Sequence, residues 1–173
     1  TQYAIPLVGG YAVLDKNYQS SAELTGNTLD TLNTTNYVLQ SLTTSATWVG
    51  RTVGPALIKG RYYYEAQVTS LVGGRVRLGA YIATQGVALP ANFSTQLTGY
   101  LANSGGGIFS NNAQAVASLA FTVGDILGVD IDITASKIVW YKNGVQIATI
   151  AITVPIGSVV FPVIDYIDTG TTA

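Results

Sequence analysis

Acid–base or metal chemistry in this chain would have to rest on carboxylates, because its 173 residues include no histidine and no cysteine. One carboxylate pair, Asp130 and Asp132, is spaced two residues apart, which places both side chains on the same face of a strand. Such a pair can hold Ca²⁺ or share acid–base work. Calcium, however, takes six or more oxygen ligands, usually from a loop, and this pair lies in the middle of a predicted strand. We therefore interpret both residues as structural, with Asp132 bonded to neighbouring backbone or to Lys137.

The other chemically suggestive residues also favour structural roles. Glu65 has no second catalytic group near it in sequence, so we expect it to pair across strands with Arg75 or Arg77. Asp125 follows a glycine before a strand, where a carboxylate can accept hydrogen bonds from backbone N–H groups. The triplet 105–107 is all glycine but lacks the Gly-Lys-Ser/Thr ending of a phosphate-binding loop. We predict a protein without enzymatic activity, cofactor or metal.

The charge balance and the short apolar runs argue against two further classes of partner, nucleic acids and membranes. Eight Lys and Arg residues face nine Asp and Glu residues, a net charge of −1, so nothing resembles the basic footprint of a nucleic-acid-binding protein. No apolar run approaches the roughly 18 residues of a membrane-spanning helix, so we predict no membrane insertion. Only 10% of the residues are charged, against about 25% in an ordinary soluble domain. A surface dominated by Thr, Ser, Asn and Gln suits a protein that sits in an assembly or outside cells.

Residues suited to binding a partner gather in and around a window without charge. From residue 78 to residue 124 no side chain is charged, and we expect the long loops of this window to be ordered and packed on the domain or on a partner. Arg and Tyr are enriched at interface hot spots, and Asn and Gln amides both donate and accept hydrogen bonds. The predicted partner-binding residues are Arg75, Arg77, Tyr81, Gln85, Tyr100, Asn103, Asn111 and Asn112. The loops expected to face outward are residues 73–75, 85–98 and 103–112.

The elements that position these residues are predicted to be strands. Apolar and polar residues alternate with a period of two, which indicates strands with one buried face. The segments are 62–68, 75–82, 127–133, 138–141, 145–154 and 161–167. Asn143-Gly144 is typical of a type I′ hairpin turn, and a phase slip near Ala148-Thr149 indicates a bulge. The pattern predicts an all-β fold, a two-sheet antiparallel β-sandwich of jelly-roll-like form.

The domain organisation is predicted to be simple. Residues 1–14 are mostly apolar and form either an edge strand of the domain or an arm laid on a neighbouring subunit. Residues 15–173 form a single β-sandwich domain, which opens with strands and loops over 15–54.

The central and C-terminal parts of the chain resemble the SPRY domain family. Gly60-Arg61-Tyr62-Tyr63-Tyr64-Glu65-Ala66 is similar to the family's Gly-Lys-Tyr-Tyr-Phe-Glu-Val strand, and residues 124–132, GDILGVDID, resemble its Gly-Asp-x-Ile-Gly-x-x-x-Asp signature. The remaining matches, in the family's order, are Trp48 to Arg51, residues 76–81, the hairpin 137–144 and Phe161-Pro162-Val163. The resemblance covers about residues 48–166 and departs from the pattern at Ala66, where the family usually has Val.

The resemblance implies a bent antiparallel sandwich of the concanavalin A-like type that presents variable loops to a partner. The Thr-, Ser-, Gly- and Asn-rich style is similar to SPRY-like modules of bacteriophage virions. We therefore expect a virion surface protein, either a capsid decoration or a tail-fibre, receptor-binding component, located on the virion surface or outside cells. Its partners would be protein subunits of an assembly, including copies of itself as a homo-oligomer, and a host-surface protein or glycan. The alternatives are a glycan-binding lectin-like module and a cellular SPRY adaptor that captures a peptide.

Overall fold

The structure, a computed structural model, describes residues 45–53, 56–68, 74–84, 86, 89–90, 93, 96, 99–111, 113–116 and 120–168. The predicted arm or edge strand at residues 1–14 and the candidate binding residues Gln85 and Asn112 lie outside this part of the chain. No helix in the part described is long and apolar enough to cross a membrane.

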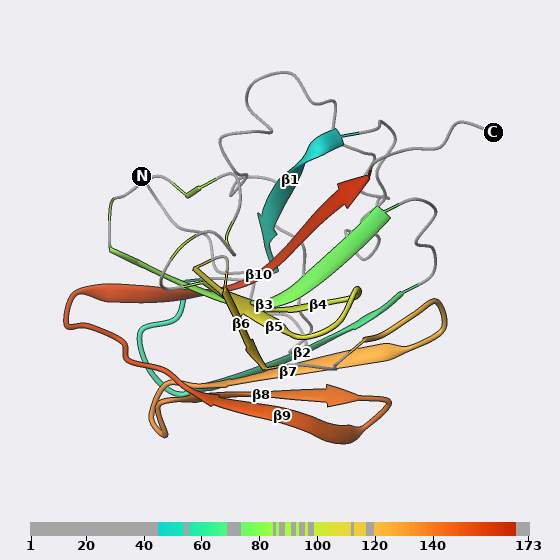
Figure 1. Ribbon diagram of the computed structural model, residues 1–173. Coiled ribbons are helices and arrows are strands. Elements are labelled where there is room, and N and C mark those ends of the chain that lie inside the picture. Colours follow the sequence, from blue (N-terminus) through green and yellow to red (C-terminus); the bar gives the residue numbers. More distant parts are fainter. Residues whose placement is uncertain are drawn as a thin grey trace, which may run out of the picture.

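Ten antiparallel strands form two sheets that face one another (Figure 1). The strands are β1 (Ser45–Thr52), β2 (Arg61–Gln67), β3 (Gly74–Thr84), β4 (Gly99–Asn103), β5 (Ile108–Ser110), β6 (Ala113–Val116), β7 (Ile126–Asp132), β8 (Lys137–Lys142), β9 (Val145–Ala151) and β10 (Ser158–Asp168). Six of them form a sheet in the order β1-β10-β3-β4-β5-β6, and four form a sheet in the order β2-β7-β8-β9. The predicted all-β, two-sheet antiparallel β-sandwich is confirmed.

The core between the sheets follows the predicted alternation. On β2, Tyr64 is buried, whereas Tyr63 and Glu65 on either side of it are exposed. On β7 and β8, Leu127, Val129, Ile131, Ile138 and Trp140 are fully buried in the same cluster. Burial of these alternating side chains removes a continuous apolar layer from water, which is the main free-energy term that holds two sheets together.

Two buried aromatic side chains also connect the sheets through hydrogen bonds. Trp140 Nε1 on β8 donates to the Leu78 carbonyl oxygen of β3, at 3.1 Å. The Tyr64 hydroxyl lies 2.9 Å from the Gly79 carbonyl oxygen and 2.8 Å from the Val163 carbonyl oxygen. A hydroxyl carries one proton, so the two carbonyl oxygens share it. Trp140 therefore fixes the position of the four-stranded sheet relative to β3, and Tyr64 fixes it relative to both β3 and β10.

The β8–β9 hairpin has the predicted turn and bulge. Asn143 and Gly144 both have positive φ, 52° and 79°. A type I′ turn requires positive φ at both of these central residues. Trp140 pairs with Ala148 while Tyr141 pairs with Gln146, so the extra residue on β9 is Ile147. The bulge thus lies beside the predicted Ala148-Thr149 position, nearer the turn by one residue.

The six-stranded sheet departs from the predicted pattern of one polar and one apolar face, because both of its faces are buried at β3. Residues 77 to 83 of this strand are all buried. A second apolar cluster covers the sheet's outer face and consists of Tyr81, Ala83, Phe93, Leu101, Phe161 and Val163, with Leu89 and Val159 packed against it. Phe93 is fully buried, so this part of the uncharged window packs on the sandwich as expected.

Candidate functional site

The structure divides the predicted binding residues into two groups at opposite ends of β3 and β4. Arg77 pairs with Asn103 across these strands, whereas Tyr81 pairs with Gly99, the residue before Tyr100. Arg77 and Tyr81 are four residue steps apart along β3, a distance of about 13 Å. The predicted residues therefore do not form a single site.

Three of the predicted binding residues have buried side chains. Arg77, Tyr81 and Asn103 are 4%, 8% and 6% exposed. The Asn103 side-chain oxygen accepts a hydrogen bond from the Gly105 backbone N–H at 2.8 Å, and the Tyr81 ring packs on Phe93 with centroids 5.2 Å apart. These positions support the sheet's outer face and do not offer side chains to a partner; they were predicted as binding residues because their types alone were visible in the sequence.

The other predicted residues differ in exposure. Arg75 and Asn111 are exposed, and Tyr100 is half-buried against the inter-sheet core. Asn111 has a positive φ of 51° in the turn between β5 and β6, and its backbone N–H donates to the Gln96 carbonyl oxygen. The rings of Tyr81 and Tyr100 thus do not provide the exposed stacking surface on which the predicted glycan site depends.

Arg75 stands at the edge of an open depression that collects loops from both sheets. The depression, of about 500 Å³, is lined by Arg75, Ser104, Gly105, Ala120, Phe121, Thr122 and Lys142. The Ser104 N–H donates to the Val76 carbonyl oxygen and its hydroxyl accepts from the Val76 N–H, which extends the pairing of β3 and β4 to the rim. Among the residues that the structure describes, none forms a hydrogen bond or ion pair with the Arg75 guanidinium.

The second cation of the depression, Lys142, is held in place by Asp125. Its ammonium lies 2.9 Å from Asp125 Oδ2 and donates to the Ala120 carbonyl oxygen at 3.1 Å. Asp125 also accepts hydrogen bonds from the Thr122 N–H and the Asn143 side-chain amide, each at 2.8 Å. The predicted role of Asp125 at a turn is confirmed, and the carboxylate locks the loop before β7 onto the β8–β9 hairpin.

This network makes the free energy of unfolding depend on pH in the acid range. The hydrogen bond from Thr122, then those from Lys142 and Asn143, lower the pKa of Asp125 from 3.8 to about 2. Because the folded-state pKa lies below the unfolded value, the stabilisation is fully present above the unfolded pKa and is lost as the pH falls towards the folded one. We expect Asp125→Asn to unfold at lower urea concentration than the wild type at about pH 6, with the gap narrowing below about pH 4. A gap that stays constant down to strongly acid pH would contradict this assignment.

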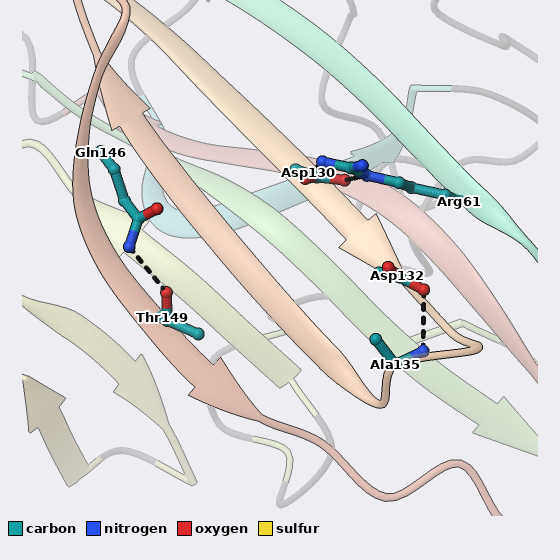
Figure 2. Close-up of polar contacts among 6 residues, drawn as sticks. All are labelled: Arg61, Asp130, Asp132, Ala135, Gln146 and Thr149. Carbon is teal, nitrogen blue, oxygen red and sulfur yellow. Dashed lines mark hydrogen bonds and ion pairs between the residues drawn. The ribbon is translucent and has the colours of Figure 1, made fainter.

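Asp130 and Asp132 have structural partners on the outer face of the four-stranded sheet (Figure 2). Asp130 is buried and accepts hydrogen bonds from Nε and a terminal nitrogen of Arg61, which points towards it from β2. Asp132 Oδ1 accepts a hydrogen bond from the Ala135 N–H at 2.8 Å, which confirms its predicted backbone role. With these groups occupied by protein partners, the pair does not present two free carboxylates to a substrate.

The predicted partner of Glu65, Arg75 or Arg77, was wrong. The Tyr63 hydroxyl donates to Glu65 Oε1, and partial desolvation of this hydroxyl together with the hydrogen bond raises the pKa of Tyr63 to about 12. Arg75 and Arg77 lie on β3 in the six-stranded sheet, whereas Glu65 lies on β2 in the other sheet. Consecutive strands that belong to different sheets cannot pair, and alternation within each strand does not reveal this.

These features define the class of protein as an antiparallel β-sandwich whose loops converge on a depression at one end. The family model of the SPRY domain matches residues 61–167, more than half of the chain, and the chain belongs to this family.

Solved structures of SPRY domains share the fold. The crystal structure of the SPRY domain of human HERC1 aligns with a TM-score of 0.55 and 17% identity, over 74% of this chain and 87% of that one. A crystal structure of a human SPRY domain aligns with a TM-score of 0.55 and 17% identity, over 76% of this chain and 86% of that one. No curated protein matches the sequence. SPRY domains are generally non-enzymatic modules for protein–protein interaction.

Proposed function

We propose that this SPRY domain is a docking module of a virion surface that binds an acidic protein segment at the Arg75 depression. The observation that carries the proposal is the exposed Arg75 guanidinium, without a described partner, beside a depression whose walls come from both sheets. A guanidinium recognises a carboxylate through two parallel hydrogen bonds, which gives both affinity and orientation. The Arg75 side chain lies beside the Gly105 turn, which would hold part of its length in place.

The virion role is supported by the composition. Only 10% of the residues are charged. A surface with so few charges repels neighbouring molecules only weakly. This suits a subunit that other subunits cover on several sides. The same surface outside the depression would contact other subunits, including copies of this chain, while the depression faces a host-surface protein. Genes for capsid and tail proteins beside the gene for this chain would support this setting, and a neighbourhood of unrelated cellular genes would count against it.

The docking role is tested with a random peptide library displayed on beads. We expect the wild-type domain to enrich peptides rich in Asp and Glu, and Arg75→Glu to lose at least tenfold of this binding because it repels the carboxylates. Lys59→Glu makes the same charge change at an exposed lysine outside the depression and serves as the matched control. Equal binding by the wild type and Arg75→Glu would refute the docking role of this depression.

A further inference from the structure

The tip of the β8–β9 hairpin carries the single Asn-Gly pair of the sequence, Asn143-Gly144. Both residues are exposed. The side-chain amide of an asparagine can react with the backbone nitrogen of the next residue, and glycine leaves that nitrogen open because it has no side chain. Asparagine is for this reason one of the heat-labile residue types of proteins. The turn that forms the hairpin therefore also contains a group capable of spontaneous covalent change.

Three hydrogen bonds hold Asn143 against the segment that leads into β7, and we call these three bonds the Asn143 latch. The Asn143 backbone N–H donates to the Ile126 carbonyl oxygen, and its side-chain oxygen accepts from the Ile126 N–H, each at 2.8 Å. Its side-chain nitrogen donates to Asp125 Oδ1, also at 2.8 Å. The Asp125 carboxylate is itself held by the Thr122 N–H and the Lys142 ammonium.

The latch holds the side-chain amide away from the reaction. Ring closure forms a bond between Asn143 Cγ and the Gly144 nitrogen, so the amide has to rotate onto its own backbone. In the folded hairpin, both polar atoms of this amide are hydrogen-bonded to residues 125 and 126, and the rotation breaks both bonds. The bond to the Asp125 carboxylate is charge-assisted, which makes it stronger than a neutral one. The reaction therefore requires that the latch opens first.

We propose that Asn143 is a deamidation site controlled by the latch, and that its reaction makes an opening of the latch permanent. The Gly144 nitrogen attacks Asn143 Cγ and gives up its proton, the bond from Cγ to the amide nitrogen breaks, and the amide nitrogen takes up a proton and leaves as ammonia. Water then opens the resulting cyclic imide at one of its two carbonyl carbons. The product is an aspartate at position 143 or an isoaspartate, in which the main chain runs through the former side-chain carboxyl carbon.

Neither product can restore the latch. In the aspartate product, a carboxylate oxygen replaces the amide nitrogen that donates to Asp125 Oδ1, so a hydrogen-bond donor becomes a like charge at the same place. The isoaspartate product adds a methylene group to the main chain of a turn whose central residues both need positive φ. Either product also adds negative charge beside Lys142, which lines the Arg75 depression. A weaker attraction for acidic segments would follow, and this last consequence alone rests on the proposed docking function.

Peptide mass mapping after incubation at mildly alkaline pH measures the deamidation of Asn143. We expect the folded wild type to react about tenfold more slowly than the same protein unfolded in urea, because a hydrogen bond to a charged group must first break. Folded Asp125→Ala should react several times faster than the folded wild type. Asp132→Ala is the matched control, since it removes the carboxylate at the opposite end of β7, and it should react like the wild type.

Asn143→Asp supplies one product directly and tests the second part of the proposal, also where Asp125→Ala does not fold. We expect it to unfold at lower urea concentration than the wild type at about pH 7, and the difference to narrow below about pH 4, where carboxylates become protonated. Asn111→Asp is the matched control, because Asn111 is likewise exposed in a turn and has a φ of 51°, against 52° for Asn143. It should unfold close to the wild type.

Three results would overturn the proposal. Equal deamidation rates in the folded and the unfolded wild type would show that the fold does not protect Asn143. A wild-type rate in folded Asp125→Ala would show that the latch is not the protecting element. Equal unfolding of Asn143→Asp and Asn111→Asp would show that the product can restore the latch. None of these measurements uses an acidic peptide, so the deamidation site and the docking role of the Arg75 depression can fail separately.

Discussion

Trp140→Ala is expected to lower the free energy of unfolding by about 3–5 kcal/mol, the range measured when a buried aromatic side chain is truncated. Trp140 is fully buried between the sheets and has the largest volume of the fully buried side chains described. Its removal leaves a cavity between the two sheets. The sheets cannot close this cavity unless some strands shift away from the neighbouring strands to which they are hydrogen-bonded. It also removes the donor to the Leu78 carbonyl oxygen, which is left without this partner in the apolar core.

Urea unfolding followed by far-ultraviolet circular dichroism measures this effect. Tyr141→Ala is the matched control, because it truncates the adjacent aromatic residue, which points to the opposite face of β8 and is only half-buried. We expect the Tyr141 variant to lose much less stability, and Trp140→Phe to fall between the two, since it keeps most of the volume but not the donor. Equal losses for Trp140→Ala and Tyr141→Ala would show that the inter-sheet core does not depend on Trp140.

The sequence predicts those parts of the fold that local periodicity determines. The alternation around Tyr64 and along β7 and β8 assigns the inner face correctly, because one face of each strand is apolar over several residues. The Asn143-Gly144 turn is predicted because positive φ at two successive residues has a local chemical cause. In each case, the residues that decide the structure are neighbours in the chain.

The parts that failed depend on contacts between distant segments. Tyr81 is buried because Phe93 and other members of the second apolar cluster cover its part of the outer face of the six-stranded sheet, and nothing within β3 signals this. Arg77 is buried as well, at 4% exposed. Alternation describes one strand at a time, so it could not show which strands share a sheet. The error in the partner of Glu65 has the same origin.

The candidate site was partly visible in the sequence. Arg75 was selected by residue type and is exposed at the depression, whereas Lys142 and Asp125 were not selected as parts of a binding surface. The sequence contained a usable signal. In an antiparallel pair, the turn before the first strand and the hairpin after the second strand lie at the same end. Asp125 directly precedes β7, and Lys142 ends β8, so the two residues occupy these positions.

Gly79→Ala is expected to cost about 3 kcal/mol or more, although it adds a single methyl group. An ideal Cβ at this position would lie 1.8 Å from the Tyr100 carbonyl oxygen and 2.9 Å from Leu101 Cα. Both atoms belong to the backbone of β4, which pairs with β3 on one side while β10 pairs with it on the other. The clash therefore cannot be relieved by rotating a side chain, and β3 must separate from β4 or shift against β10.

Gly105→Ala is the matched control, because the nearest atom to its added Cβ is Asn103 Oδ1 at 3.4 Å, an ordinary contact. We expect this variant to unfold within about 0.5 kcal/mol of the wild type, the usual range for an unconstrained surface substitution. If Gly79→Ala yields too little folded protein for an unfolding curve, a soluble yield far below that of Gly105→Ala gives the same answer. Equal stability of the two variants would mean that β3 and β4 do not approach as closely at Gly79 as the structure has them, and that the pairing beside the buried Tyr64 hydroxyl can open to admit a side chain.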